Sequence, residues 1–271
     1  MFTSIKKYFP PTLESTNLYR LVAHVALVYF IFTGTLHEWL IALCVYFFAV
    51  TIGGTITLHR LLAHKSFVAP KWFEYLGSTV STLCGSSVSA LAWVALHREH
   101  HRYTDTEKDP HSPKFYGYWR VQFRDTKLPN FKYIPDLARD KVHVFLHNYH
   151  WPLVLVYAFI VYCFDPRALL YFWLVPGILV WHGGSLTNTL NHSPIGYRNY
   201  KSGDDSINNP ISGILVSGEG WHNNHHSYPQ DPKLGHKWWE FDLGWQIIKL
   251  VRLDKENNNR RFDLEDPKPL D

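Results

Sequence analysis

The chain has 271 residues, of which 46% are hydrophobic, 18% charged and 16% aromatic. This length suits one large domain or two small ones, and the aromatic content excludes an intrinsically disordered chain, which has few aromatic residues and a high net charge. The formal net charge is only +4, and no basic run resembles a nucleic-acid-binding segment. The chain has 17 histidines, and histidine is the commonest metal ligand.

Two apolar segments near the N-terminus are long enough to cross a membrane. Residues 19–36 and 39–58 contain no acidic residue, and Arg20 is their only basic one. Twenty helical residues extend about 30 Å, which is the thickness of the hydrocarbon core of a bilayer. Only His37 and Glu38 separate the two segments, so we expect a tight transmembrane hairpin.

A second hairpin is expected at residues 151–164 and 168–186, joined by Asp165, Pro166 and Arg167. Arg167 is the only lysine or arginine in the two short connectors, so the positive-inside rule predicts that both termini and the central segment are cytoplasmic. We therefore expect an all-α membrane protein with four transmembrane helices and a cytosolic helical cap, formed by residues 59–150 and 187–253. Two buried hairpins of a soluble protein are the alternative, which apolarity around the whole helix disfavours.

The remaining segments complete one domain that covers residues 1–271. Residues 72–97 are apolar but rich in Ser, Thr and Gly, and we expect a helix packed on the membrane interface or on the protein rather than a fifth span. Residues 198–212 are expected to form a loop, and the polar residues 254–271 a solvated tail. The three cysteines lie far apart in apolar stretches and are expected to be small core residues: Cys44, Cys84 and Cys163.

Nine histidines fall into short spaced groups. They are His59 and His64 in HRLLAH; His97, His100 and His101 in HREHH; His192 at the end of NTLNH, four residues after Asn188; and His222, His225 and His226 in HNNHH. In H-x-x-H-H all three rings face one side of a helix, so two such helices facing each other can surround a pair of metal ions. The five-residue step in HRLLAH is about 140° of α-helical rotation, so one of its histidines should lie near a helix end.

The ligand types limit the metal without identifying it. The absence of cysteine clusters excludes thiolate zinc and iron–sulfur sites. A ferritin-like site needs two E-x-x-H motifs, and only Glu219 with His222 forms one. Imidazole suits Fe, Zn, Cu and Ni, although nine neutral donors fit oxygen chemistry better than hydrolysis. The other eight histidines lack this spacing and are expected to have ordinary surface or hydrogen-bonding roles: His24, His37, His111, His143, His147, His150, His182 and His236.

The boxes HRLLAH, HREHH and HNNHH, with the flanking stretches AWVALHREHHRYTDTEKDPHSP, NTLNHSPIGYRNY and GEGWHNNHHSYP, resemble the membrane-bound fatty acid desaturases. The resemblance runs from about His59 to Trp245 and is to the Δ9 (stearoyl-type) branch, in a form most like its bacterial and cyanobacterial members. It implies a four-span, mushroom-shaped α fold with a cytosolic di-iron site. It also implies an O₂-dependent enzyme that places a cis double bond, at Δ9, in a saturated acyl chain carried by CoA or a lipid.

The resemblance assigns roles residue by residue. One Fe²⁺ would be held by His59, His64, His97, His101 and His226. The other would be held by His100, His192, His222 and His225, with Asn188 reaching it through a water. Trp93 matches a family tryptophan that lines the tunnel for the long-chain acyl substrate. Ala95 and Leu96 stand where animal acyl-CoA enzymes carry charged residues, which leaves the acyl carrier open.

The electrons for O₂ must come from a partner, because the chain has no dinucleotide motif, cysteine quartet or recognisable haem domain. We expect a ferredoxin or a small b-type cytochrome to dock on the basic cytosolic surface, near Arg120, Arg124 and Lys127, alongside contacts with membrane lipid. Two other functions stay open. A fatty acyl or alkane hydroxylase would use the same metal chemistry, and a histidine-rich metal transporter would place its ligands inside the spans.

Overall fold

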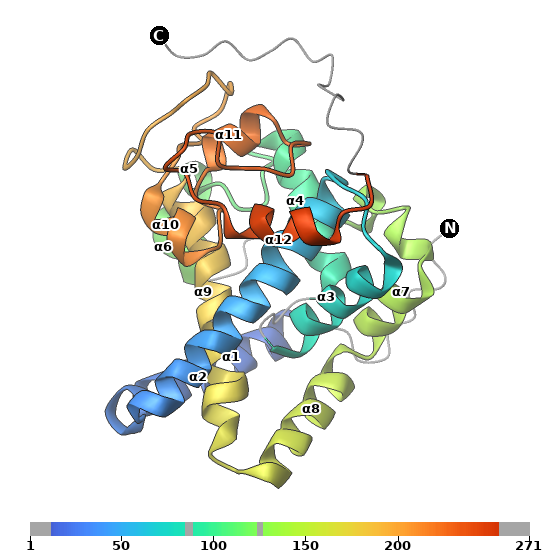
Figure 1. Cartoon of the computed structure of the whole chain (residues 1–271), viewed down its shortest axis with the longest axis vertical. Helices are drawn as coiled ribbons and strands as arrows, with labels where there is room; N and C mark the ends of the chain where they lie inside the picture. The colour runs from blue at the N-terminus through green and yellow to red at the C-terminus, as the bar shows by residue number, and fades with distance from the viewer. Residues whose placement is uncertain (1–11, 85–88, 124–126, 255–271) are drawn as a thin grey trace.

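The computed structural model describes residues 12–84, 89–123 and 127–254. All regular structure in this part of the chain is helical, apart from isolated bridges that join Tyr197 to Asn208 and Asn208 to Trp221. The longest helices form one end of the molecule, and the short helices gather at the opposite end (Figure 1). The prediction of an all-α protein is confirmed.

The first hairpin consists of α1 (Leu13–Thr33) and α2 (Leu36–Phe48). The connector is Gly34 and Thr35, so its placement at His37 and Glu38 was wrong. The Thr35 hydroxyl accepts a hydrogen bond from the Glu38 amide (3.3 Å), and the Glu38 carboxylate accepts one from the Thr35 amide (2.7 Å). This T-x-x-E capping box satisfies two free amides and starts the helix at Leu36.

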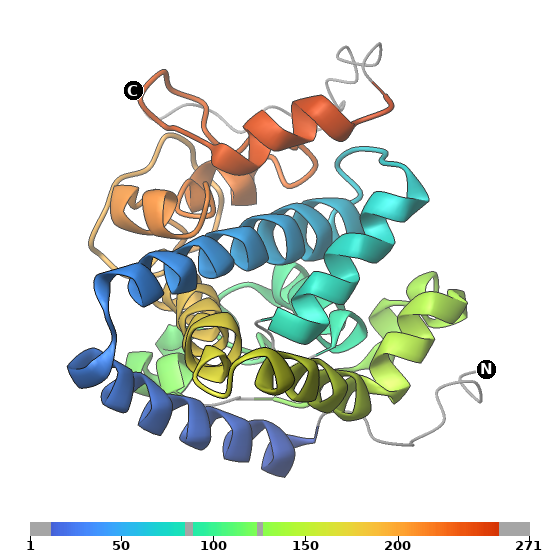
Figure 2. The same ribbon diagram turned by 60° about the horizontal axis from the view of Figure 1, so that its bottom comes forward.

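The second helix continues without a break from α2 into η1 (Ala49–Ala63), a π-helix. It therefore ends five residues beyond the predicted limit at Leu58 and carries HRLLAH into the short-helix end of the molecule. Figure 2 shows α2 and η1 as one rod with α3 (Lys71–Cys84) beside its second half. The two helices approach closely because Gly77 has no side chain, and a Cβ at Gly77 would overlap the Thr57 hydroxyl.

The second hairpin pairs α8 (His150–Phe164) with η4 (Leu169–Leu174) and α9 (Val175–Leu190). Arg167 in its connector forms an ion pair with Glu38 and donates to the Thr33 carbonyl (2.6 Å). This arginine therefore joins the connectors of both hairpins.

Within the described residues, three helices are long and apolar enough to cross a membrane: Glu14–Thr33, Leu36–Ala63 and Leu169–Leu190. The predicted third span is α8, which follows α7 (Lys141–Asn148) after a bend of 72°, and only the two together reach the required length. Large apolar side chains on these helices are exposed, such as Phe32 (82%) and Phe164 (87%). Cys44 and Cys163 are exposed as well, so their prediction as core residues was wrong; the side chain of Cys84 lies outside the described part.

The remaining helices gather at the short-helix end, where α4 and α12 pack on η1 and where α6 and α10 pack on α9. They are α4 (Ala90–Tyr103), α5 (Pro113–Tyr116), α6 (Tyr118–Phe123), η2 (Phe131–Tyr133), η3 (Leu137–Arg139), α10 (Pro210–Leu215), α11 (His222–Ser227) and α12 (Leu243–Val251). Residues 72–97 form α3 and the first half of α4, with residues 85–88 outside the described part. The expected loop at 198–212 is largely irregular until α10 begins at Pro210. The expected tail lies outside the described residues from 255 onward.

Candidate metal centre

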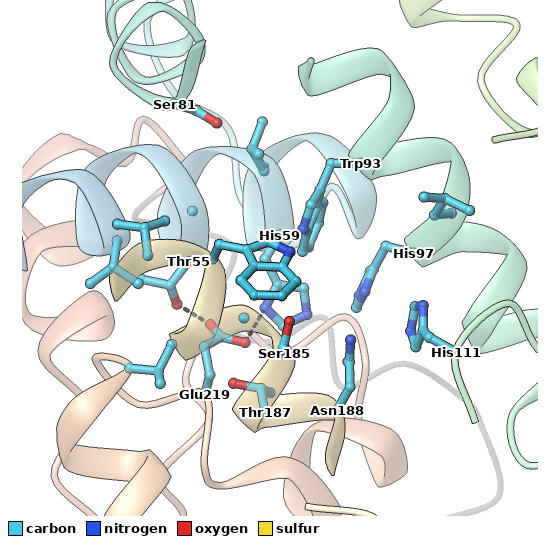
Figure 3. A pocket seen from close by; sticks show the side chains of 18 of the residues that line it. Thr55, His59, Ser81, Trp93, His97, His111, Ser185, Thr187, Asn188 and Glu219 are labelled. Carbon is cyan, nitrogen blue, oxygen red and sulfur yellow. Dashed lines mark hydrogen bonds and ion pairs between the residues drawn. The ribbon is translucent and has the colours of Figure 1, made fainter. Parts of the chain in front are cut away.

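Four elements bring the nine clustered histidines together: η1, α4, the end of α9 and α11. The histidines form two groups, and within each group the nearest donor atoms lie within 4.8 Å of one another. The first group is His59, His64, His97, His101 and His225; the second is His100, His192, His222 and His226. Figure 3 shows His59 and His97 of the first group at the wall of a cavity.

The grouping corrects one expectation, because His225 lies in the first group and His226 in the second, not the reverse. In each H-x-x-H-H helix, the two histidines four residues apart share a group. His97 and His101 do so on α4, and His222 and His226 on α11. The middle histidine of each motif points to the other group. A step of four residues rotates by about 40° and a step of three by about −60°, so the middle ring diverges from the other two.

The five-residue spacing of HRLLAH fits π-helical geometry. The His64 amide donates to the His59 carbonyl (3.1 Å), which is the i→i+5 bond of a π-helix. The two rings lie 4.9 Å apart, and His64 is the last residue of the turn. The prediction that one of the pair lies near a helix end is confirmed, but the 140° separation applies only to an α-helix.

The nitrogen atoms of both groups fit metal ions better than they fit one another. In the first group, Nε2 atoms lie only 2.8 Å apart for His64 and His97, and 3.0 Å apart for His59 and His225. In the second group, the four Nε2 atoms are buried and have no hydrogen-bond partner among the described residues: His100, His192, His222 and His226. Buried polar atoms normally have a partner, and two metal ions would supply it for both groups.

Carboxylates hold the far nitrogen of four of these rings. The distances from Nδ1 to the nearest carboxylate oxygen are 2.6 Å for His59 and Glu219, 2.9 Å for His100 and Asp109, 3.0 Å for His192 and Asp105, and 2.8 Å for His226 and Asp204. A carboxylate that accepts the Nδ1 proton leaves the Nε2 lone pair free for a metal and fixes the ring orientation. Of these four carboxylates, the sequence pointed only to Glu219, as half of an E-x-x-H motif and as a residue expected to lie behind the metal ligands, and the three aspartates were not singled out.

Burial keeps several of these rings neutral. Burial lowers the pKa of His97, His101, His222 and His225 well below the usual histidine value. Burial also lowers the pKa of His226 to about 4, although Asp204 opposes that shift. Burial raises the pKa of Asp109, but His100 outweighs it and the net pKa is lowered. Neutral imidazoles supported by ionised carboxylates are the form that binds metal at neutral pH.

A cavity passes along this centre between η1 and α9. His59, His97 and His222 are in its wall, together with Trp93 and Asn188. The Trp93 ring stacks on His97 at 4.7 Å, with 14° between the planes. Trp93 and Asn188 therefore both border the cavity, and their roles in the reaction stay predictions.

His111 is the residue whose position the sequence analysis missed. Its ring stacks on His100 at 4.5 Å, it lines the cavity, and its Nε2 is buried without a hydrogen-bond partner in the described part of the chain. Burial lowers its pKa to about 3. The available signal was its position two residues after Asp109, whose carboxylate accepts from the His111 amide (3.0 Å).

The Fatty acid desaturase family model matches residues 11–256. The chain belongs to that family. A desaturase of *Anabaena variabilis* named sn-1 stearoyl-lipid 9-desaturase is 34% identical over 224 residues, which is 79% of this chain and 80% of the relative. Delta-9 acyl-lipid desaturase 1 of *Arabidopsis thaliana* is 33% identical over 248 residues (83% and 78%). Acyl-CoA C20 Delta5-desaturase of *Anemone leveillei* is 32% identical over 251 residues (88% and 80%). This desaturase is therefore an oxidoreductase of fatty acyl chains, as its motifs predicted.

Proposed function

We propose that this desaturase uses O₂ and two iron ions to introduce a cis Δ9 double bond into a saturated acyl chain. The observation that carries the proposal is the pair of buried histidine groups beside an elongated cavity. The Δ9 position is supported by the two acyl-lipid relatives named for it. The Δ5 relative is equally similar overall, so the position has to be measured.

The iron ions would supply the O₂-activating redox chemistry when bound. His59, His64, His97, His101 and His225 would hold one, and His100, His192, His222 and His226 the other. The carboxylates of Asp105, Asp109, Asp204 and Glu219 orient four of these rings. Asn188 lines the same cavity as His222 of the second group, and its side-chain amide is suited to hold a water there.

The cavity would determine which methylenes react. Along α9 it extends from Asn188 to Val180, a helical distance of about 12 Å. Ala49, Val50 and Val216 form an apolar part of the wall, which suits the methyl end of an acyl chain. Trp93 covers His97 and would hold the chain against the centre. Positioning of this kind fixes which C–H bonds are attacked.

A membrane lipid is the acyl carrier that the wall of the cavity supports best. CoA carries several phosphate charges, which need multiple cationic partners. Among the described residues, the cationic side chains of the wall are Arg20 and Lys127, and Lys127 is paired with Glu99 (2.8 Å). At Leu96 the wall is apolar, as the motif AWVALH indicated.

We further propose four crossings with the bent pair α7–α8 as the third, and with both termini and the metal centre on the cytoplasmic side. The charge distribution of the connectors supports the orientation. The bent pair α7–α8, added to the three candidate helices, gives the expected four spans. The domain would then comprise the whole chain.

The reaction needs an external electron donor, and the structure suggests a revised docking surface. Reduction of O₂ to two waters takes four electrons and four protons. Two of each leave with the substrate hydrogens, so the donor supplies two electrons and solvent two protons. Of the three residues first considered, Arg124 lies outside the described part, and Arg120 is exposed on α6. Lys127 lines the cavity and is paired with Glu99.

A better surface lies beside His101, which is only partly buried. We define the tyrosine–cation patch as Arg102, Tyr103, Lys108, Lys132 and Tyr133. The three cations are exposed. Arg102 and Lys108 each lie 5.7 Å from the Tyr103 ring, and Lys132 lies 4.8 Å from the Tyr133 ring. We propose that a ferredoxin or a small b-type cytochrome docks there, because such carriers are acidic and the patch adjoins a ligand of the first group.

The decisive experiment is the fatty-acid profile of cells that express the protein, with the double-bond position determined. The expected product is lighter than its substrate by two hydrogen atoms and has the cis bond at Δ9. A product heavier by one oxygen atom would instead establish a hydroxylase. Purified protein should contain two iron ions per chain, and iron-free protein with full activity would contradict the proposed centre.

A further inference from the structure

Helix α6 is a single-layer wall between the cavity and the outer surface. Val121 points inward, is 5% exposed and lines the cavity. On the outer face, Trp119 is 79% and Phe123 46% exposed, and their rings stack at 5.9 Å. The helix lies beside α9 where the long helices meet the short ones (Figure 1). One short helix therefore separates the cavity from whatever surrounds the molecule.

A directed chain of hydrogen bonds fastens α6 to α9 and α1. The Gln122 side-chain amide donates to Nδ1 of His182 (3.0 Å). Because that nitrogen accepts, His182 carries its proton on Nε2, which donates to Nε2 of His24 (3.0 Å). The remaining nitrogen of His24 then donates to the Arg20 carbonyl (2.7 Å). The Thr189 hydroxyl donates to the Gln122 oxygen (3.0 Å), so both ends of this side chain are held.

The cavity has a polar end at this wall and an apolar end away from it. Arg20 lies over the Trp181 ring at 4.6 Å, and both residues line the cavity, as Val121 does. The Trp181 ring also lies 6.5 Å from the ring of Phe123 on α6. The other end is bordered by Ala49, Val50 and Val216. An anionic or ester head group fits the Arg20 end, and a hydrocarbon tail fits the other.

The outer surface at this wall is continuous with a surface built for lipid. On α1, Leu21 and Val25 are each 63% exposed, and α1 is a candidate membrane span. The ring of Phe123 on α6 lies 6.5 Å from the ring of His24 on α1, measured between the ring centroids. Exposed aromatic side chains beside a span are typical of the membrane interface.

We propose that α6 is the side entrance through which the acyl chain of a bilayer glycerolipid enters the cavity, with Arg20 and Trp181 at the head-group end. The inference rests on the proposed function and identifies the route and the class of its substrate. Gln122 is a positioning residue that holds the entrance closed. Entry from the bilayer lets the ester head stay at the interface while the chain passes Val121.

The test uses iron-loaded full-length protein in phosphatidylcholine vesicles without an electron donor, so that binding is observed without turnover. The probe is a phosphatidylcholine with a photoactivatable group in the middle of a saturated chain, and labelled residues are identified by mass spectrometry. Wild type should be labelled at Trp93. Val121→Trp should reduce this labelling at least about tenfold with unchanged iron content, whereas Ile214→Trp, on an exposed face of α10 away from the cavity, should leave it unchanged.

Gln122→Leu provides a second variant that keeps the side-chain volume and removes the hydrogen bonds. In this variant the lipid probe should label Trp93 severalfold faster than in wild type, and the iron content should be the same. Equal labelling in wild type, Val121→Trp and Gln122→Leu would overturn the entrance, as would labelling of Trp93 by a water-soluble acyl-CoA probe but not by the lipid. Wild type that labels at Trp93 yet makes no double bond with a donor would refute the proposed function and leave the entrance standing.

Discussion

At the residue scale, the histidine groups follow from small differences in rotation along a helix. The second group has four nitrogens and the first has five. Loss of one ligand therefore leaves three in the second group and four in the first, which is still enough for a tetrahedral site.

We predict that His226→Ala loses the iron of the second group and so keeps one iron per chain. His225→Ala should bind the iron of the first group more weakly but keep more than half of it. Both variants should lose desaturation, because each disturbs the centre. Iron analysis of the two purified proteins, with circular dichroism as a check on folding, measures the difference. Identical iron content in both variants would contradict the grouping.

His111 should matter more than its place outside the motifs suggests. Its ring supports His100, which is the middle histidine of HREHH, and it also lines the cavity. We expect His111→Ala to reduce turnover about 10- to 100-fold, the usual range for residues that orient metal ligands. His37→Ala is the matched control, because His37 is exposed in the first turn of α2. Equal turnover rates for the two variants would show that His111 has only an ordinary surface or hydrogen-bonding role.

At the element scale, Arg98 anchors the end of η1 and depends on Asp136. Its guanidinium donates to the carbonyls of Leu62 (2.7 Å) and Ala63 (3.1 Å), and to the Asp136 carboxylate (2.8 Å). Burial raises the pKa of Asp136, but hydrogen bonds from Arg98 and Lys65 outweigh it and hold that pKa well below its usual range.

A carboxyl group whose pKa is lower in the folded than in the unfolded protein stabilises the fold. This stabilisation is complete above the pKa of the unfolded state and is lost as the pH falls toward the pKa of the folded state. We therefore predict that Asp136→Asn lowers the melting temperature at pH 7, and that the difference from wild type narrows as pH falls below about 4, the ordinary aspartate pKa. Thermal unfolding of both proteins between pH 7 and pH 3 measures this. A constant difference across that range would exclude the linkage.

The contact between α3 and η1 depends on Gly77. A methyl group there would overlap Thr57, whose side chain is fully buried, and would lie 3.0 Å from the Ile52 carbonyl. We predict that Gly77→Ala destabilises the protein by about 1–3 kcal/mol, the usual cost of overpacking. Gly184→Ala is the control, because a Cβ there meets nothing within 4 Å. Melting temperatures in detergent would show the difference, and equal values would mean that α3 moves aside freely.

At the scale of the whole molecule, the tyrosine–cation patch is the surface on which we propose that the electron donor docks. We predict that charge reversal of Arg102, Lys108 and Lys132 together raises the apparent donor KM about tenfold or more, with unchanged iron content. The wild-type rate should also fall as salt rises to about 0.1 M, where the Debye length is about 10 Å. A turnover rate that does not depend on salt, together with an unchanged donor KM in the triple variant, would show that the donor does not dock on this patch.

The sequence determined the features that depend on residue type and short-range spacing. Continuous apolar stretches predicted the long helices, and the four histidine motifs identified all nine members of both groups. The T-x-x-E box at Thr35 and Glu38 was also present in the sequence, although the connector was placed three residues too late. Such features are local, because the hydrogen bonds and ring directions involved lie within one or two helical turns.

The tertiary structure decided everything that depends on contacts between distant segments. It paired His59 with Glu219 across 160 positions and His192 with Asp105 across 87, and it brought His111 against His100. It also turned HRLLAH into a π-helix, whose i→i+5 bonding no α-helical wheel anticipates. These outcomes follow from the packing of η1, α4, α9 and α11 against one another. Spacing along the chain fixes the direction of a side chain on its own helix, but only packing fixes what that side chain meets.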